Sequence, residues 1–147
     1  MIKFNQKHKF NNKKIETAEG VFDSKGEWQR WLFLKDAERE GHITNLQRQV
    51  RYTLIPTQYR DEVIQLKTKT KIVKRVAERE ITYTADFVYF KVYKDDAVTN
   101  YTFDGVGEWV VEDFKGYPND RWPLKKAMML YFHGIPVREV KKPTEPI

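Results

Sequence analysis

The sequence predicts an α/β fold in which a mixed central sheet is flanked by helices. Two segments carry apolar residues at helical spacing and four show strand-like patterns, in the order α, β, β, β, α, β. A lysine-rich stretch between the first and second strands predicts a basic β-hairpin arm. The chain has 147 residues, which suits one domain with a real core, so we expect a single domain over residues 1–147.

The first helix is predicted from Ser24 to Gly41. Ser24 and Glu27 fit the S-x-x-E capping box, and a glycine after the periodic residues is a common helix stop. Its predicted apolar face consists of Trp28, Trp31, Leu32 and Leu34. We expect Glu27 to share the inward side of this helix with Trp31 and Leu34.

The second helix is predicted from Asp120 or Arg121 to His133. Gly134 and Pro136 follow it and should end it. The apolar residues at helical spacing within it are Leu124, Ala127, Met128 and Tyr131.

The strands are predicted from alternation and from aromatic and β-branched content. They span residues 49–55, 82–93, 109–115 and 137–140, and the first of them stops at Pro56. Within residues 59–79, threonine alternates with lysine, which is typical of an extended, exposed arm. The single domain is therefore expected to carry three appendages: a basic N-terminal arm (1–20), a basic hairpin insertion (58–80) and a loose tail (141–147).

The composition excludes several kinds of site. There is no cysteine, so disulfides and thiolate metal sites are excluded, and His8, His42 and His133 lack a zinc-ligand spacing. Any metal must therefore be held mainly by oxygen. No apolar run is long enough to cross a bilayer, and the basic N-terminus lacks the apolar core of a secretory signal, so we expect cytoplasmic residence.

The charge of the chain favours a polyanionic partner. The formal net charge is +6 and the sequence pI is near 9.4, with lysines crowding the N-terminus and residues 67–79. Cations placed on phosphates release counterions, so this distribution is typical of nucleic-acid binding. The alternative is that each charge run is solvated surface.

A group of acids and one lysine predicts a magnesium site for phosphodiester hydrolysis. Asp113 and Lys115 lie two residues apart on a predicted strand, so both should face one pocket. Asp86 lies in an otherwise apolar strand, where a shared cation would remove the cost of burying it; the alternative is a salt bridge, even to Lys115 itself. Glu27 could add a third carboxylate, although the capping box alone explains a glutamate there.

Several further residues are predicted to contact nucleic acid. Gln49, just before the first strand, could position water or a phosphate, but a polar strand start needs no function. Lysines on the second helix could meet phosphates or serve solubility only. The predicted DNA-binding residues are Lys13, Lys14, Gln49, Lys67, Lys69, Lys71, Lys74, Arg75, Lys125 and Lys126.

These residues carry a family resemblance. Asp86, Asp113-Phe114-Lys115 and helix-borne Glu27, in αβββαβ order, resemble the PD-(D/E)XK nuclease superfamily. Across nearly the whole chain, six blocks in order are similar to a family of small phage-encoded endonucleases of that superfamily: NNKK, FDSKGE, GHITNLQRQV, YTADFVY, VVEDFKG and VREV. The superfamily often has Glu where Asp113 stands, and its name-giving proline is replaced by Ala85.

The resemblance implies a restriction-endonuclease-like core and a DNA endonuclease that requires Mg²⁺ or Mn²⁺. It implies metal ligation by Asp86 and Asp113, catalysis by Lys115, and a helix carboxylate at Glu27. It further implies action on branched DNA, akin to Holliday junction resolvases in phage recombination, replication or packaging, by a homodimer. Three alternatives stay open: a non-catalytic DNA-binding module on this fold, a sequence-specific restriction-type nuclease, and a regulatory or structural phage protein.

Overall fold

A four-stranded mixed sheet forms the centre of the protein in the computed structural model, which describes residues 14–93, 106–115 and 120–147. Its strand order is β3 (Ile43–Ile55), β6 (Ile81–Val92), β7 (Gly107–Phe114) and β8 (Val137–Val140). The first two pairings are antiparallel and β7–β8 is parallel. The predicted α/β class with a mixed sheet is confirmed.

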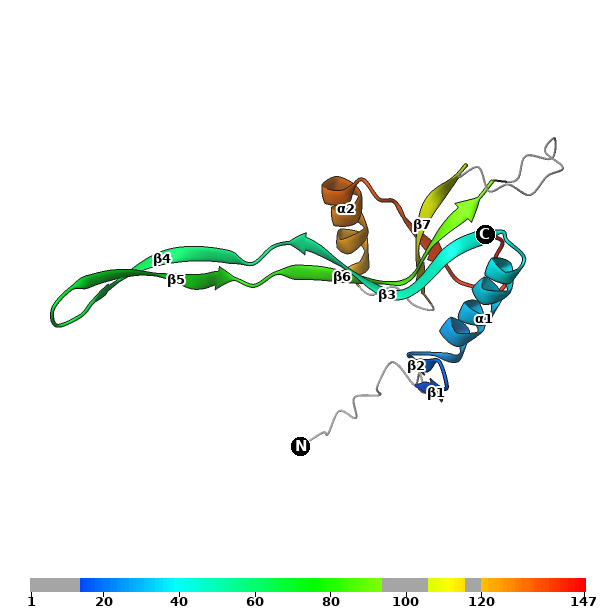
Figure 1. Ribbon diagram of the computed structural model, residues 1–147, viewed down its shortest axis with the longest axis horizontal. Coiled ribbons are helices and arrows are strands. Elements are labelled where there is room, and N and C mark those ends of the chain that lie inside the picture. Colours follow the sequence, from blue (N-terminus) through cyan, green and yellow to red (C-terminus); the bar gives the residue numbers. More distant parts are fainter. Residues whose placement is uncertain (1–13, 94–105, 116–119) are drawn as a thin grey trace, which may run out of the picture.

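Two helices cover opposite faces of this sheet (Figure 1). Helix α1 (Lys25–Arg39) packs Leu34 and Ala37 against one face, and helix α2 (Trp122–His133) packs Trp122 and Met129 against the other. The Ser24 side chain accepts a hydrogen bond from the Glu27 amide, so the predicted cap is present. Neither helix in the described part of the chain has the length and apolar content needed to cross a membrane.

The buried face of α1 differs from the predicted one. Leu34 and Glu27 are buried as expected, but Leu32 is 39% exposed and a charged residue that was not expected there, Arg30, lies inside. The Arg30 guanidinium donates to both oxygens of Glu112, at 2.7 and 2.9 Å. Counting apolar residues alone misplaced this face because its partner surface on β7 carries a buried carboxylate.

The long strands β3 and β6 rotate about their own axes near Gln49 and Asp86. Ala85 packs on the α2 side of the sheet and Phe87 on the α1 side, although strict alternation would put both on one side. Gln49, on the neighbouring strand, has a left-handed backbone conformation (φ 52°). Such irregularities re-aim side chains in a sheet, and here they turn polar side chains toward the end of β7. The first strand was predicted to begin at residue 49, and it begins at Ile43, before this irregularity.

The predicted basic hairpin is present as β4 (Gln58–Gln65) and β5 (Thr70–Glu78). It continues directly from β3 and β6, pairs only with itself in the described residues, and extends away from the body (Figure 1). Every residue of the two strands is at least partly exposed. The arm therefore adds no layer to the core.

The two ends of the chain are more ordered than predicted where they are described. Residues 1–13 of the expected N-terminal arm lie outside the described residues, and the rest forms a small hairpin of β1 (Ile15–Thr17) and β2 (Gly20–Phe22). The expected loose tail at 141–147 is instead held to the body. Arg30 donates to the carbonyls of Pro143 and Glu145, and Lys91 donates to the carbonyl of Ile147 at 3.0 Å. Buried arginine donors, absent from a pattern-based prediction, fix this segment.

Candidate functional site

Glu27 is placed by the first turn of α1. Its backbone amide donates to the Ser24 hydroxyl at 3.1 Å, and one carboxylate oxygen accepts from the Asp23 amide at 2.9 Å. The side chain is only 4% exposed, and burial raises the pKa of its carboxyl above the usual value. The Asp23 amide therefore engages one oxygen of the Glu27 carboxylate, and the other oxygen faces the sheet.

The Gln49 amide connects Glu27 to Asp86. Its Nε2 lies 3.4 Å from Glu27 Oε1 and 3.3 Å from Asp86 Oδ1, so both are long, weak hydrogen bonds. The other Asp86 oxygen accepts from the Phe114 amide at 2.8 Å, at the point where the β6–β7 pairing ends. The left-handed backbone of Gln49 aims its side chain here, which sequence patterns do not reveal.

Asp113 and Lys115 lie together beyond Asp86, as predicted. Asp113 is 1% exposed, and its Oδ1 accepts from the Tyr83 hydroxyl at 2.9 Å. Lys115 Nζ lies 2.6 Å from Asp113 Oδ2 and 4.7 Å from the centre of the Trp122 ring. The Lys115 ammonium is therefore the charged partner of the buried Oδ2, which accepts no further hydrogen bond within the described ranges.

The carboxylates interact electrostatically. The pKa of Asp86 is raised to about 7, first by burial and then by the negative charge of Asp113, with a smaller contribution from Glu27. The Phe114 amide and the Lys115 ammonium act in the opposite direction and do not compensate. A carboxylate whose pKa is raised by neighbouring negative charge is stabilised in its ionised form by an added divalent cation.

The predicted three-carboxylate metal cluster is not assembled as such. Over residues 14–93, 106–115 and 120–147, no three acidic or histidine side chains are grouped closely enough to hold a metal. Glu27 is separated from Asp86 by the Gln49 amide, and Lys115 occupies one side of Asp113. The carboxylates of partly buried Asp86 and buried Asp113 lie near one another, and the Lys115 ammonium is the cation that the described residues place beside them.

A cavity of about 230 Å³ opens beside Asp113 and Lys115. Its other lining residues are Thr82, Tyr83, Thr84, Trp122 and Lys125. Lys125 lines this cavity, whereas Lys126 lies 3.6 Å from Glu139 in an ion pair outside it, and the DNA contacts of both stay predictions. Sequence reasoning missed Tyr83, Thr82 and Thr84; the available signal was their place just before Asp86 on one strand.

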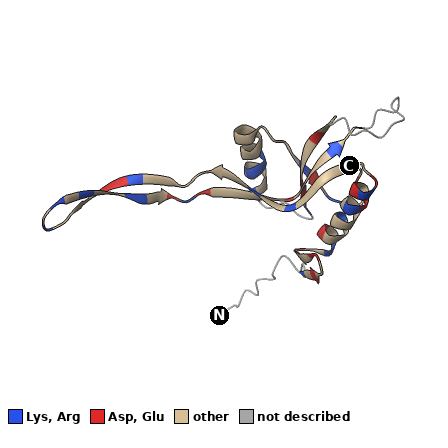
Figure 2. Cartoon of the chain, in the orientation of Figure 1, with Lys and Arg blue, Asp and Glu red and all other residues tan. Residues whose placement is uncertain are grey.

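The other predicted DNA-binding residues divide between the arm and the N-terminal region. Lys13 lies outside the described residues, and Lys14 lies 3.4 Å from Asp23 in an ion pair. The cations of the arm are spread, together with some acidic residues, along an exposed ribbon that extends away from the body (Figure 2). These cations are Lys67, Lys69, Lys71, Lys74 and Arg75.

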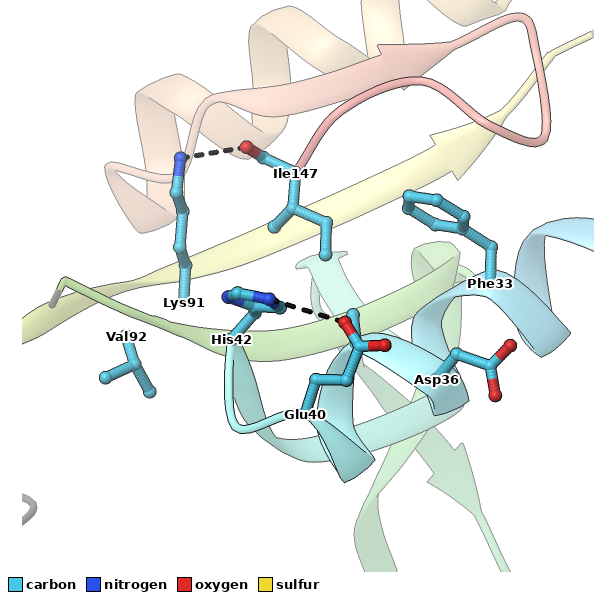
Figure 3. Close-up of a pocket in the computed structure, with 8 residues that line it drawn as sticks. Phe33, Asp36, Glu40, His42, Lys91, Val92 and Ile147 are labelled. Carbon is cyan, nitrogen blue, oxygen red and sulfur yellow. Dashed lines mark hydrogen bonds and ion pairs between the residues drawn. The ribbon is translucent and has the colours of Figure 1, made fainter. Parts of the chain in front are cut away.

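A larger hollow, of about 540 Å³, lies at the other end of α1 and contains none of the predicted residues (Figure 3). Two of its polar groups are engaged: Lys91 Nζ donates to the Ile147 carbonyl at 3.0 Å, and His42 Nε2 lies 3.4 Å from Glu40 Oε2. Its size alone does not make it the functional site, since the buried and mutually interacting carboxylates are elsewhere.

Comparison with known proteins places this architecture in a family. Residues 7–141 match the family model described as "Protein of unknown function (DUF1064)". The chain belongs to the DUF1064 family. Searches of curated proteins and of solved structures each gave no match. For this DUF1064 chain, the nuclease resemblance stays a prediction, and the function must be argued from the site.

Proposed function

We propose that this DUF1064 chain is a metal-dependent DNA endonuclease that hydrolyses phosphodiester bonds, with a preference for branched DNA such as Holliday junctions. One observation carries the proposal: two carboxylates, partly buried Asp86 with a raised pKa and buried Asp113 paired with the Lys115 ammonium at 2.6 Å, lie beside a cavity that Asp113 and Lys115 line. Buried carboxylates in this state, in a cleft, are more typical of a functional site than of a structural one.

Asp86 and Asp113 would hold Mg²⁺ or Mn²⁺, and Glu27 would act on the same site through Gln49 or through water. The cation would supply charge neutralisation on the phosphate and a more acidic water. Tyr83 orients Asp113 through its hydroxyl. Lys115 has its ammonium at the cavity, where it would stabilise the negative charge that develops on the phosphate oxygens.

The cavity suits a phosphodiester. Lys115 and Lys125 provide positive charge, and Thr82 and Thr84 provide hydroxyl groups, within about 230 Å³. In the proposed hydrolysis, the oxygen of water bonds to phosphorus and the bond between phosphorus and the 3′ oxygen breaks. One product strand then ends in a 3′-hydroxyl, and the other carries the phosphate at its 5′ end. The water's proton leaves to solvent or to a neighbouring carboxylate.

The arm would bind flanking DNA through one face. Directly opposite residues of a hairpin share a face, so Arg60 and Arg75 lie side by side, with Lys71 further along. Glu62 lies on the same face and accepts a hydrogen bond from Arg75 at 3.0 Å, which leaves this face with an excess of positive charge. Lys74 lies on the other face, 3.8 Å from Asp61, where no further cation of the two strands adds to it.

The test is cleavage of synthetic four-way junction, flap and linear duplex DNA with Mg²⁺ or Mn²⁺. Wild type should cut the junction best, and Asp113→Asn and Lys115→Ala should each lose on the order of 10³-fold in rate. Asp36→Asn and Lys141→Ala, which make the same changes at exposed positions, should cut like wild type. Circular dichroism should show that all five proteins fold.

A second candidate function is a DNA-binding module without catalysis. It is favoured by the Asp113–Lys115 ion pair, which satisfies part of the buried charge without a metal. Junction binding by every variant, with no cutting by wild type in either metal, would establish this function and exclude the nuclease. A ladder of discrete plasmid fragments would indicate sequence-specific cutting instead.

A further inference from the structure

The β4–β5 arm has two chemically different faces. In its register, Tyr59 is opposite Val76 and Val63 is opposite Ile72, so these four apolar side chains share one face. Each is more than half exposed, at 59%, 51%, 66% and 66% respectively. The cationic side chains at positions 60, 71 and 75 lie on the opposite face. We call the first of these the apolar face of the arm.

The apolar face has no partner within the described part of the chain. An isolated two-stranded ribbon is marginally stable in water unless a third strand or a helix covers it. The charged pair on this face, Asp61 and Lys74, is mutually neutralising at 3.8 Å. A neutral, apolar surface is a poor match for phosphates and a good match for another apolar protein surface.

A second exposed apolar surface lies on α2. Its large side chains are Leu124, Leu130, Tyr131 and Phe132, with exposed fractions of 62%, 56%, 83% and 52%. A shallow hollow of about 460 Å³ lies among them, lined by Ala127, Met128, Leu130, Tyr131 and Phe132. The helix contains no acidic residue. We call this the α2 patch; its hollow can receive an apolar side chain.

The chain cannot cover the α2 patch with its own arm. The arm leaves the body near the C-terminal end of α2, where His133 Nε2 lies 2.9 Å from the Thr53 carbonyl, and runs outward (Figure 1). The described residues of a single copy therefore leave both surfaces exposed, and both are of the kind that protein interfaces bury.

We propose that the apolar face of the arm docks on the α2 patch of a second copy of this chain, in a reciprocal, two-fold arrangement. Such symmetry uses each surface twice. At on the order of 100 Å² per exposed large apolar side chain, the two contacts would remove roughly 1,600 Å² from water, which is the size of a standard interface. The cationic face would point outward. This inference does not rest on the proposed nuclease activity.

Sedimentation velocity over a wide protein concentration range tests the assembly. Wild type should show a species of twice the 17.7 kDa chain mass. Ile72→Lys in the arm and Tyr131→Lys in the α2 patch should each raise the dissociation constant at least about tenfold. Val73→Lys, on the same strand but the opposite face, should leave it unchanged. A wild type that is monomeric at all concentrations would overturn the proposal, whatever effect Ile72→Lys has on DNA binding.

Disulfide cross-linking identifies which surfaces meet, because the chain has no native cysteine. Val63→Cys and Tyr131→Cys proteins, mixed and oxidised, should form a heterodimer that disappears on reduction. Each variant oxidised alone should cross-link far less. Equal cross-linking of Val63→Cys with itself would show arm-on-arm pairing and overturn the docking proposed above, as would the absence of any cross-link in the mixture.

Discussion

The body and the arm are built on one continuous pair of strands, yet they place side chains in opposite ways. In the body, charged groups are buried: Asp113 is 1% and Glu27 is 4% exposed. In the arm, apolar groups are exposed: Val63 and Ile72 are each 66% exposed. Each arrangement opposes the stability of an isolated chain. These two regions are therefore where binding of a partner would most increase the stability of the protein. The partners we propose are a cation and a phosphate for the body and a protein surface for the arm.

The body itself contains two kinds of buried charge, and the largest predicted effect separates them. Arg30 and Glu112 are fully buried and pair through two hydrogen bonds, unlike the crowded acids at the site. Arg30→Met should reduce the free energy of unfolding by about 3–5 kcal/mol, because it leaves the Glu112 carboxylate buried without its cation. Urea denaturation measures this.

The control for Arg30→Met is Arg39→Met, which breaks an exposed ion pair with Asp36 at 2.8 Å. It should cost less than about 1 kcal/mol. An equal loss in both variants would mean that the buried pair is not what holds α1 and residues 141–147 to the sheet.

The next prediction tests whether the site acids are arranged for a cation. Mg²⁺ or Mn²⁺ at 100 times its dissociation constant should stabilise the wild type by about 2.7 kcal/mol, because it binds only the folded state. Asp113→Asn should abolish this stabilisation, whereas Asp36→Asn should retain it. Thermal unfolding with and without the metal, with EDTA as the reference, gives the result; stabilisation of all three proteins alike would exclude Asp113 as a ligand.

A pH-dependent effect should distinguish Asp86 from ordinary surface acids. Its pKa rises from 3.8 to about 7 on folding, so between these values the folded state keeps a proton that the unfolded state loses. Stability contributed by this group therefore falls as pH rises through that window. Asp86→Asn should be more stable than wild type by about 1–3 kcal/mol at pH 8, since each pKa unit corresponds to about 1.4 kcal/mol, reduced by solvent screening.

At pH 4, Asp86→Asn and wild type should be nearly equal in stability, because the wild-type carboxyl is then largely protonated in the folded state. Chemical denaturation at several pH values without metal ions measures the difference. A variant that is less stable than wild type at pH 8 would show that Asp86 is a structural acceptor for the Phe114 amide and not a strained acid.

Patterns in the sequence predicted the parts of the molecule that local periodicity controls. The sheet strands, both helix stops and the shared orientation of Asp113 and Lys115 follow from alternation and caps. The register of β6 against β3 does not, because it shifts between Thr44 and Gln47 and again between Thr53 and Ile55, and alternation does not mark such irregularities. The bridge that the Gln49 side chain forms between Glu27 and Asp86 could not be predicted either, because nothing in the sequence marks the left-handed backbone at Gln49.

Long-range partners were the other limit of sequence reasoning. Arg30 lies on a helix between Gln29 and Trp31, and nothing in this stretch marks it as buried. Its partner, Glu112, is far along the chain on β7, and only the packed structure brings them together. Long-range pairing also decides the faces of the arm. Its lysines are evident in the sequence, but only the strand register shows that Arg60 shares a face with Arg75 and not with Lys74.

The smallest expected effect tests the cationic face of the arm. Each phosphate contact that is lost reduces the salt dependence of DNA binding by about 0.9 in the log–log slope. Arg60→Ala should therefore lower the slope by about one, whereas Lys74→Ala, which removes the same charge from the opposite face, should leave it nearly unchanged. Fluorescence anisotropy with junction DNA in EDTA prevents cleavage during the measurement. Equal slopes for the two variants would mean that the arm acts only through its net charge, and that its two faces do not differ toward DNA.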